Sequence, residues 1–176
     1  MNNYNKLIIF ISVLIIGFGG AMLYLSWPLL TGKSYTLATM PVDPFDILRG
    51  QYITIRYEIG TVSNKDLNFT EADVRKNIYV ILKKDINGIS RLKEVSFEKP
   101  GSGLDFIKGN IKSVYGNSAN VEYGIEQFFF ERDARVETRG MTIEVKVDDS
   151  GQARIYQLLK DGEPLNIQYK NRSLTD

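Results

Sequence analysis

The feature that most constrains this chain is an uncharged, largely apolar segment over residues 7–30, which lies between Lys6 and Lys33. A helix rises about 1.5 Å per residue and the hydrocarbon core of a bilayer is about 30 Å thick, so about 20 apolar residues are enough to cross it. The segment has 24 residues. It therefore predicts a transmembrane helix over residues 7–30, preceded by a cytoplasmic N-terminus over residues 1–6.

A cleavable signal peptide is the alternative interpretation of this segment. Residues 1–6 would be its charged region, residues 7–18 its apolar region, and Gly19 and Ala21 would supply the small residues at the cleavage site. Against cleavage, the sequence remains apolar from residue 22 to residue 30. We favour the uncleaved membrane anchor.

The flanks of the apolar segment indicate how it would lie in a membrane. Tyr24 and Trp27, near its end, are of the type that is enriched at membrane interfaces. Lys6 and the amino terminus on one side, against Lys33 on the other, give a small charge bias that favours a cytoplasmic N-terminus. We expect a single-pass protein of the inner (cytoplasmic) membrane with most of the chain outside the cytoplasm.

Gly17 and Ala21 are four residues apart and would share one face of the helix. Such small residues would allow another helix in the lipid bilayer to approach closely. The alternative is that small residues are simply common in transmembrane helices.

The remainder of the chain has the size and charge of one ordinary domain. Its 143 residues, from Ser34 to Asp176, are enough to bury a hydrophobic core. Apart from Lys6 and Lys33, the chain has 20 basic and 21 acidic residues. This balance provides no broad positive surface, so we expect no nucleic-acid partner.

The chain contains no cysteine and no histidine. Disulfides, thiolate nucleophiles and sulfur or imidazole metal ligands are therefore excluded, and with them serine–histidine triads and most zinc sites. The lack of cysteine also agrees with an oxidising compartment. We expect no cofactor and no metal site.

Strand patterns dominate the sequence after the apolar segment. We interpret residues 31–40 as a polar tether and expect the folded domain to cover residues 41–176, with a proline-rich start. Apolar and polar residues alternate over residues 51–59 and most clearly over residues 141–147, which predicts two half-buried strands.

Turn residues divide the rest of the domain into further strands. Asn87 and Gly88 predict a hairpin. Other turns are expected at residues 101–103, 116–118, 148–151 and 161–162. Helix is expected only in short pieces, with a capping-box-like start over residues 70–73 and two turns over residues 131–139. About eight strands at this spacing predict a mainly β domain with minor α content, built as an antiparallel barrel-like or sandwich structure.

Residues 50–57 resemble the motif of a bacterial membrane-anchored family that is named after its GDYxxLxY sequence. Residues 123–126 are similar to a second landmark of that family. The motif positions here are Gly50, Gln51, Tyr52, Ile55 and Tyr57, and the second landmark supplies Tyr123, Gly124 and Glu126. Two positions depart from the motif, because Gln51 replaces an aspartate and Ile55 replaces a leucine.

The resemblance implies a fold and a membrane location rather than a reaction, because the family has no established activity. Relatives are often encoded beside multi-pass membrane proteins, which implies a partner in the same bilayer. Gln51 removes the only negative charge of the motif. Any acid–base or metal-binding role that this carboxylate has in relatives would therefore be missing here.

The motif has a structural and a functional interpretation. In the structural one, Ile55 and Tyr57 face the core, while Tyr52 and Arg56 pack together on the opposite face of the strand. In the functional one, Arg49, Tyr52 and Arg56 lie near one end of the β-domain and bind a carboxylate or phosphate of a lipid or protein partner.

Enzymatic functions have little support in the sequence. The close carboxylate pairs, Asp43 with Asp46 and Asp148 with Asp149, lie in turn-like sequence, where aspartate usually accepts local hydrogen bonds. The layout is faintly similar to that of anchored signal peptidases, but Asp43 stands nearest the place of their serine and no suitable lysine base follows. We expect a non-enzymatic accessory or binding protein of the bacterial envelope. The alternatives are a membrane-anchored hydrolase and a cleaved, secreted periplasmic binding domain.

Overall fold

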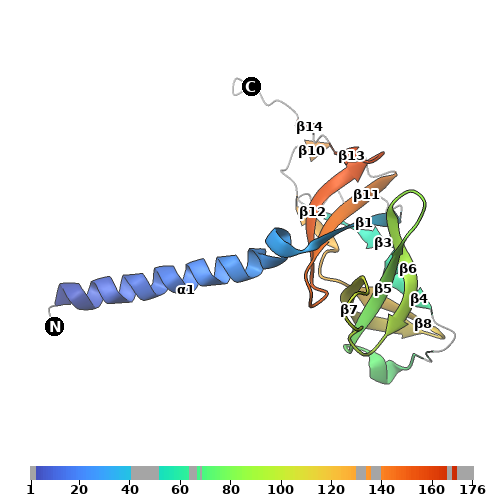
Figure 1. Cartoon of the computed structure of the whole chain (residues 1–176), viewed down its shortest axis with the longest axis horizontal. Helices are drawn as coiled ribbons and strands as arrows, with labels where there is room; N and C mark the ends of the chain where they lie inside the picture. Colours follow the sequence, from blue (N-terminus) through green and yellow to red (C-terminus); the bar gives the residue numbers. More distant parts are fainter. Residues whose placement is uncertain are drawn as a thin grey trace.

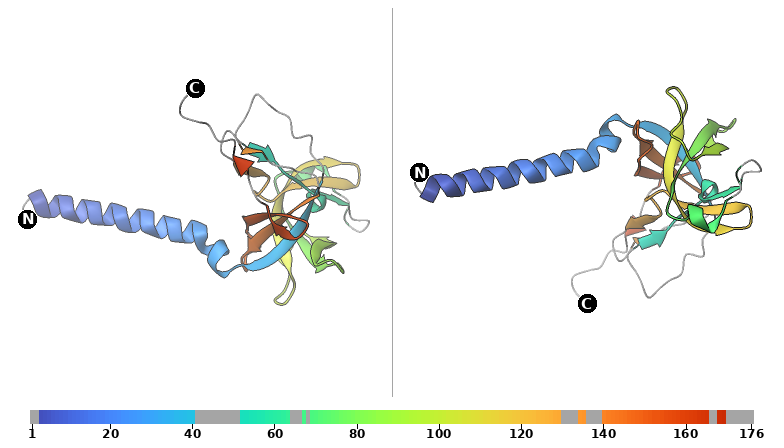
Figure 2. Two further views of the ribbon diagram at one scale, coloured as in Figure 1. Left: turned by 90° about the horizontal axis from the view of Figure 1, so that it is seen from above. Right: turned by 90° about the horizontal axis from the view of Figure 1, so that it is seen from below.

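The computed structural model describes residues 3–40, 52–63, 67, 69–129, 134–135, 140–165 and 168–169. A long helix, α1 (Asn3–Thr31), projects from one side of a domain built from strands (Figures 1 and 2). At 1.5 Å per residue, its 29 residues extend about 44 Å. The part over Asn3–Trp27 is long and apolar enough to cross a membrane, a property that signal sequences share, and it is not buried by the domain.

The helix continues into the sheet through a single residue, Gly32, so the prediction of a tether over residues 31–40 was wrong. Lys33–Met40 form strand β1, which pairs with β11 (Met141–Val147) on one side and β6 (Ile89–Ser96) on the other. The physical reason is the alternation within this stretch, since Tyr35 and Leu37 are buried in the core between more polar neighbours.

Within the described residues, ten strands form one open sheet. Its order is β13-β12-β11-β1-β6-β5-β7-β8-β4, and β3 pairs separately with the end of β1. The strands not yet given are β3 (Arg56–Tyr57), β4 (Thr61–Ser63), β5 (Asn77–Lys84), β7 (Phe106–Tyr115), β8 (Ser118–Glu122), β12 (Ala153–Lys160) and β13 (Glu163–Pro164). The described part of the chain also has two short strand pairs outside this sheet, β2 (Tyr52–Thr54) with β9 (Gln127–Phe129) and β10 (Ala134–Arg135) with β14 (Gln168–Tyr169).

The predicted fold class, mainly β after one N-terminal apolar helix, is confirmed. Two details differ from the expectation. The sheet is mixed, because β1 and β6 are parallel, and it does not close into a barrel. Strand β1 comes first in the chain but lies between strands from two later hairpins, and this arrangement depends on contacts that are distant in the sequence.

The predicted turns join neighbouring strands as expected. Asn87 and Gly88 lie in the β5–β6 hairpin, and Gly116, with a positive φ of 56°, lies between β7 and β8. Residues 148–151 connect β11 to β12, and residues 161–162 connect β12 to β13. These local hairpins account for most of the sheet.

The predicted strand over residues 51–59 is broken into shorter elements. Strands β2 and β3 are followed by a 3-10 turn, η1 (Glu58–Gly60), although Ile55, Tyr57 and Ile59 are all buried as the alternation predicted. The capping box at Thr70 is confirmed at a second 3-10 turn, η2 (Glu71–Asp73). The helix expected over residues 131–139 is contradicted where this stretch is described, because Ala134–Arg135 form β10.

Candidate functional site

The family motif and its second landmark meet in space although about 70 residues separate them. Strand β2 pairs with β9 directly after the landmark, with Thr54 opposite Gln127. The backbone N–H of Ile55 donates a hydrogen bond to the carbonyl of Glu126 at 2.7 Å. We call Ile55, Tyr57, Tyr123, Gly124 and Glu126 the motif cluster.

Two tyrosine hydroxyls join these segments from opposite sides. The Tyr57 hydroxyl donates to the carbonyl of Ile125 at 2.7 Å, and the Tyr123 hydroxyl donates to the carbonyl of Ile59 at 2.6 Å. Both rings are almost fully buried, with 2% and 4% of their surfaces exposed. Each tyrosine therefore satisfies a backbone carbonyl in the other segment.

Glu126 organises the turn that positions Tyr123. Its carboxylate accepts hydrogen bonds from the backbone N–H of Tyr123 at 2.5 Å and of Gly124 at 2.9 Å. Gly124 has a φ of +77°, a conformation that residues with a Cβ adopt at a steric cost. The three conspicuous residues of the second landmark thus form one turn.

Burial is the main electrostatic influence on the motif tyrosines. It raises the pKa of Tyr57 and of Tyr123 well above the ordinary value, and the negative charge of Glu126 raises both further. Both hydroxyls therefore stay protonated at neutral pH and remain donors to backbone carbonyls. This geometry supports the structural interpretation of Ile55 and Tyr57.

The residues of the predicted anion site are only partly within the described structure. Arg56 is exposed on β3, and the backbone of Tyr52 lies in β2. Arg49, Gly50 and Gln51 and the side chain of Tyr52 lie outside the described residues. Whether Arg49, Tyr52 and Arg56 converge thus remains a prediction.

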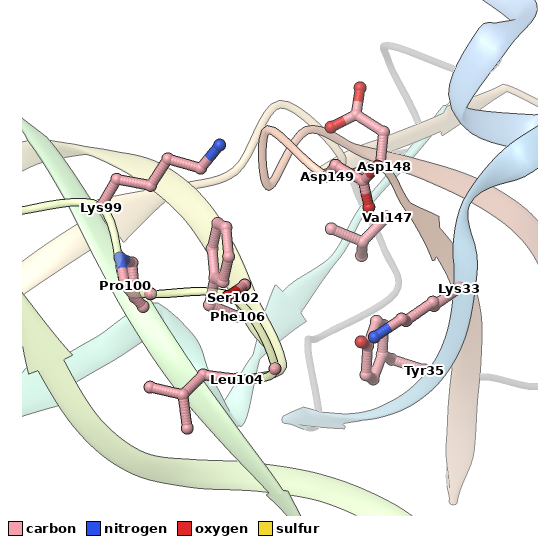
Figure 3. Close-up of a pocket in the computed structure, with 12 residues that line it drawn as sticks. Lys33, Tyr35, Lys99, Pro100, Ser102, Leu104, Phe106, Val147, Asp148 and Asp149 are labelled. Carbon is pink, nitrogen blue, oxygen red and sulfur yellow. The ribbon is translucent and has the colours of Figure 1, made fainter.

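A cavity of about 570 Å³ lies near the end of helix α1, and no residue pattern in the sequence analysis predicted it. We call it the helix-end cavity. It is formed by the start of β1, the loop between β6 and β7, the start of β7, and the turn between β11 and β12 (Figure 3). Its lining residues are Lys33, Tyr35, Lys99, Pro100, Gly101, Ser102, Gly103, Leu104, Phe106, Val147, Asp148 and Asp149.

Hydrogen bonds hold the walls of the helix-end cavity together. The Tyr35 hydroxyl on β1 donates to the Asp105 carboxylate at 2.6 Å, and the backbone carbonyl of Asp105 accepts from the Leu82 N–H on β5 at 2.8 Å. The N–H of Lys108 on β7 donates to the carbonyl of Gly151, in the β11–β12 turn, at 2.9 Å. The cavity is therefore preformed by segments distant in the sequence.

Asp105 is the charged group behind one wall of this cavity. The hydrogen bond from Tyr35 is the largest influence that lowers its pKa, and Lys33, whose Nζ lies 3.4 Å away, lowers it further. Burial raises the pKa of Tyr35, and the hydrogen bond to Asp105 raises it as well. The pair therefore stays as a neutral tyrosine and a carboxylate at neutral pH.

The two aspartates of the cavity belong to the β11–β12 turn. Oδ1 of Asp148 accepts hydrogen bonds from the N–H groups of Ser150 and Gln152 and from the Ser150 hydroxyl. This confirms that Asp148 is a local turn acceptor, whereas Asp149 is exposed at the tip. Asp43 and Asp46 lie outside the described residues. In the described part of the chain, no three acidic side chains cluster as a metal site would require.

The sequence contained two signals for the helix-end cavity. Alternation from Lys33 to Met40 could have predicted β1, and the glycines at 101 and 103 indicated a loop. Neither signal reveals that these segments meet the β11–β12 turn, because that depends on the position of β1 in the sheet.

A comparison with known protein families finds a match over most of the chain. The model of a family described as GDYXXLXY protein matches residues 15–158, which include both segments of the motif cluster and every residue that lines the helix-end cavity. No curated protein and no solved structure matches the chain.

Proposed function

Because the chain belongs to the GDYXXLXY protein family, we propose that it is a single-pass accessory or binding protein of the bacterial envelope. Helix α1 is its uncleaved anchor in the inner membrane, and the β-domain lies outside the cytoplasm. Its role is to bind rather than to catalyse, in company with a multi-pass membrane protein.

The observation that supports an anchor most strongly is the junction between helix and sheet. Only Gly32 separates α1 from β1, and β1 lies inside the ten-stranded sheet rather than at its edge. The apolar helix leaves its side chains uncovered by the domain. In water this surface is unfavourable, whereas in a bilayer it is the expected lipid-facing surface.

The chemistry of the motif cluster favours a structural over a catalytic use of its polar groups. Its tyrosine hydroxyls donate to backbone carbonyls, and its carboxylate accepts from backbone N–H groups. These groups stabilise the contact between two segments. The sequence also lacks the histidine and cysteine side chains on which most nucleophilic and zinc-dependent hydrolases depend.

The helix provides a surface for the membrane partner. Gly17 and Ala21 are exposed on α1, and a Cβ built at Gly17 would meet no atom within 4 Å. We propose that the partner helix packs on this face. Gly19, which is also exposed but points to the opposite face of the helix, is a matched control position.

Two experiments test this function. Full-length protein is expected to stay in the membrane pellet after alkaline extraction, and a variant with Leu14→Arg and Ile15→Arg in the middle of the span is expected to be released. Recovery of both the full-length protein and the variant in the soluble fraction would contradict the anchor.

The second experiment tests the helix face. A photo-crosslinking residue at position 17 is expected to capture a multi-pass protein that the same residue at position 19 does not capture. Equal capture at both positions, or capture at neither, would exclude the proposed helix face.

A further inference from the structure

We propose that the helix-end cavity binds the headgroup of a zwitterionic phospholipid, in which a phosphate diester is joined to a primary ammonium group. The inference rests on the proposed membrane anchor, because it requires the cavity to face a bilayer. It adds a ligand class to the proposed binding role.

The position of the cavity follows from the chain itself. Lys33 and Tyr35 line it, and they come two and four residues after the last residue of α1, Thr31. Trp27, near the same end of the helix, is exposed and of the type found at the level of lipid headgroups. A helix that spans the membrane thus places the cavity at the headgroup layer (Figures 1 and 3).

The charges around the cavity fit a ligand with one positive and one negative group. Two lysines, Lys33 and Lys99, and two aspartates, Asp148 and Asp149, line the cavity, and Asp105 lies behind the wall against Lys33. Figure 3 shows the charged residues on separate segments, with Lys33 on β1, Lys99 on the β6–β7 loop and both aspartates on the β11–β12 turn. Lys99 suits the phosphate because Lys33 already pairs with Asp105, and Asp149 suits the ammonium because Asp148 already accepts three hydrogen bonds.

Ligands with a single charge fit this cavity less well. A purely anionic headgroup would meet the repulsion of Asp148 and Asp149, and Asp105 lies behind the same wall. A simple cation would be repelled by the positive charges of the two lysines. Opposite charges on both sides favour the zwitterion over either alternative.

The rest of the lining is suited to the apolar part of a lipid. Leu104, which is 44% exposed, and the partly exposed ring of Phe106 contribute aliphatic and aromatic surface, while Tyr35 and Val147 line the cavity from the buried core. The glycerol backbone and the first methylene groups can cover this surface. Because hydrogen bonds between β1, β5, β7 and the β11–β12 turn already fix the walls, little ordering is needed when the ligand binds.

Native mass spectrometry of the full chain in detergent tests the proposal directly. The protein is mixed with equal amounts of phosphatidylethanolamine and phosphatidylglycerol, and the retained lipid is counted. We expect phosphatidylethanolamine to be preferred, and Lys99→Ala or Asp149→Ala to reduce its retention about three- to fivefold, as expected for one exposed charged contact. Matched controls are Lys93→Ala and Glu163→Ala, exposed charges outside the cavity, which should leave retention unchanged.

A second variant tests the cavity without changing charge. Ser102→Trp places a bulky side chain on an exposed lining position and is expected to reduce retention of phosphatidylethanolamine, with an unchanged circular dichroism spectrum. Equal or greater retention of phosphatidylglycerol, or unchanged retention in all three cavity variants, would overturn the inference.

A soluble headgroup identifies the source of the ligand. Glycerophosphoethanolamine, which has the same charges but no acyl chains, is expected to bind more weakly than the lipid. Equal affinity would overturn the assignment to a membrane lipid. Alkaline extraction separates failure of lipid binding from failure of the anchor. A protein that retains no lipid but stays in the membrane after this extraction contradicts only the lipid-binding inference.

Discussion

At the level of single residues, the motif tyrosines act as buried donors to the backbone. Replacing Tyr57 or Tyr123 by phenylalanine leaves the carbonyl of Ile125 or Ile59 buried without its hydrogen bond. We expect each substitution to lower the free energy of unfolding by about 1–3 kcal/mol. Urea unfolding of the full chain in detergent, followed by near-ultraviolet circular dichroism, measures this change.

The control for this prediction is an exposed tyrosine. Tyr156 is 55% exposed on β12, so Tyr156→Phe should change the free energy of unfolding by less than about 0.5 kcal/mol. Equal effects of the buried and exposed substitutions would show that the hydroxyl bonds in the motif cluster do not stabilise the fold.

The same tyrosines predict a loss of stability at alkaline pH. Burial and Glu126 raise the folded-state pKa of Tyr57 and Tyr123 above the ordinary value of 10.0. A raised folded-state pKa means that the stabilisation is complete below pH 10 and is lost as the pH rises above it, by up to about 1.4 kcal/mol per pH unit for each tyrosine. Unfolding measured from pH 9 to pH 11.5 should show a shallower slope for Tyr57→Phe than for the unchanged protein; identical slopes would contradict the assignment.

At the level of elements, the turn between β11 and β12 is fixed by close contact with β7. Gly151 has a φ of +86°, and a Cβ there would lie 2.7 Å from Phe106 Cε2 and 3.0 Å from the backbone N of Lys108. We expect Gly151→Ala to reduce the free energy of unfolding by about 2–4 kcal/mol through backbone strain and overpacking. Gly101→Ala, in open space and without a positive φ, is the matched glycine control; a similar loss there would contradict the explanation.

The capping box of η2 makes a prediction in acid. The Asp73 carboxylate accepts hydrogen bonds from Lys76 and from both the N–H and the hydroxyl of Thr70, and these lower its pKa to about 2. Its contribution to stability is present above pH 3.8 and is lost as the pH falls towards 2. In an NMR titration, Lys76→Ala should raise the pKa of Asp73 more than Thr70→Ala does, because the contact with Lys76 is the largest cause. A larger rise of the Asp73 pKa in Thr70→Ala than in Lys76→Ala would contradict this assignment of the main cause.

The elements also show how far the sequence could predict this fold. Local signals were sufficient for the hairpins, the capping box and the alternating strand β11, because each depends on neighbours in the chain. Strand β1 was missed, since a short alternating stretch after an apolar helix was interpreted as a tether. The helix-end cavity was missed for the same reason: Tyr35 meets Asp105 only because β1 is inserted between β11 and β6.

The motif cluster was predicted in part. The burial of Ile55 and Tyr57 followed from alternation, but the hydroxyl bonds to Ile125 and Ile59 did not. Such bonds depend on long-range pairing of β2 with β9, for which local sequence patterns give no register.

For the molecule as a whole, the direct connection of helix and sheet determines where the domain lies. With one residue between α1 and β1, the domain has little freedom to move away from the end of the helix. A membrane anchor then places the helix-end cavity beside the lipid headgroups. A cleaved signal peptide would instead release a soluble domain that begins with a short apolar remnant before β1.

The mature N-terminus distinguishes these two cases most directly. Intact-mass measurement of the protein recovered from cells, after separation of membrane and soluble fractions, gives both the first residue and the location. We expect the mass of a chain that still contains helix α1, residues 3–31, and recovery of this chain in the membrane fraction after alkaline extraction. A soluble protein whose mass corresponds to a chain that starts directly after Ala21 would contradict the uncleaved membrane anchor.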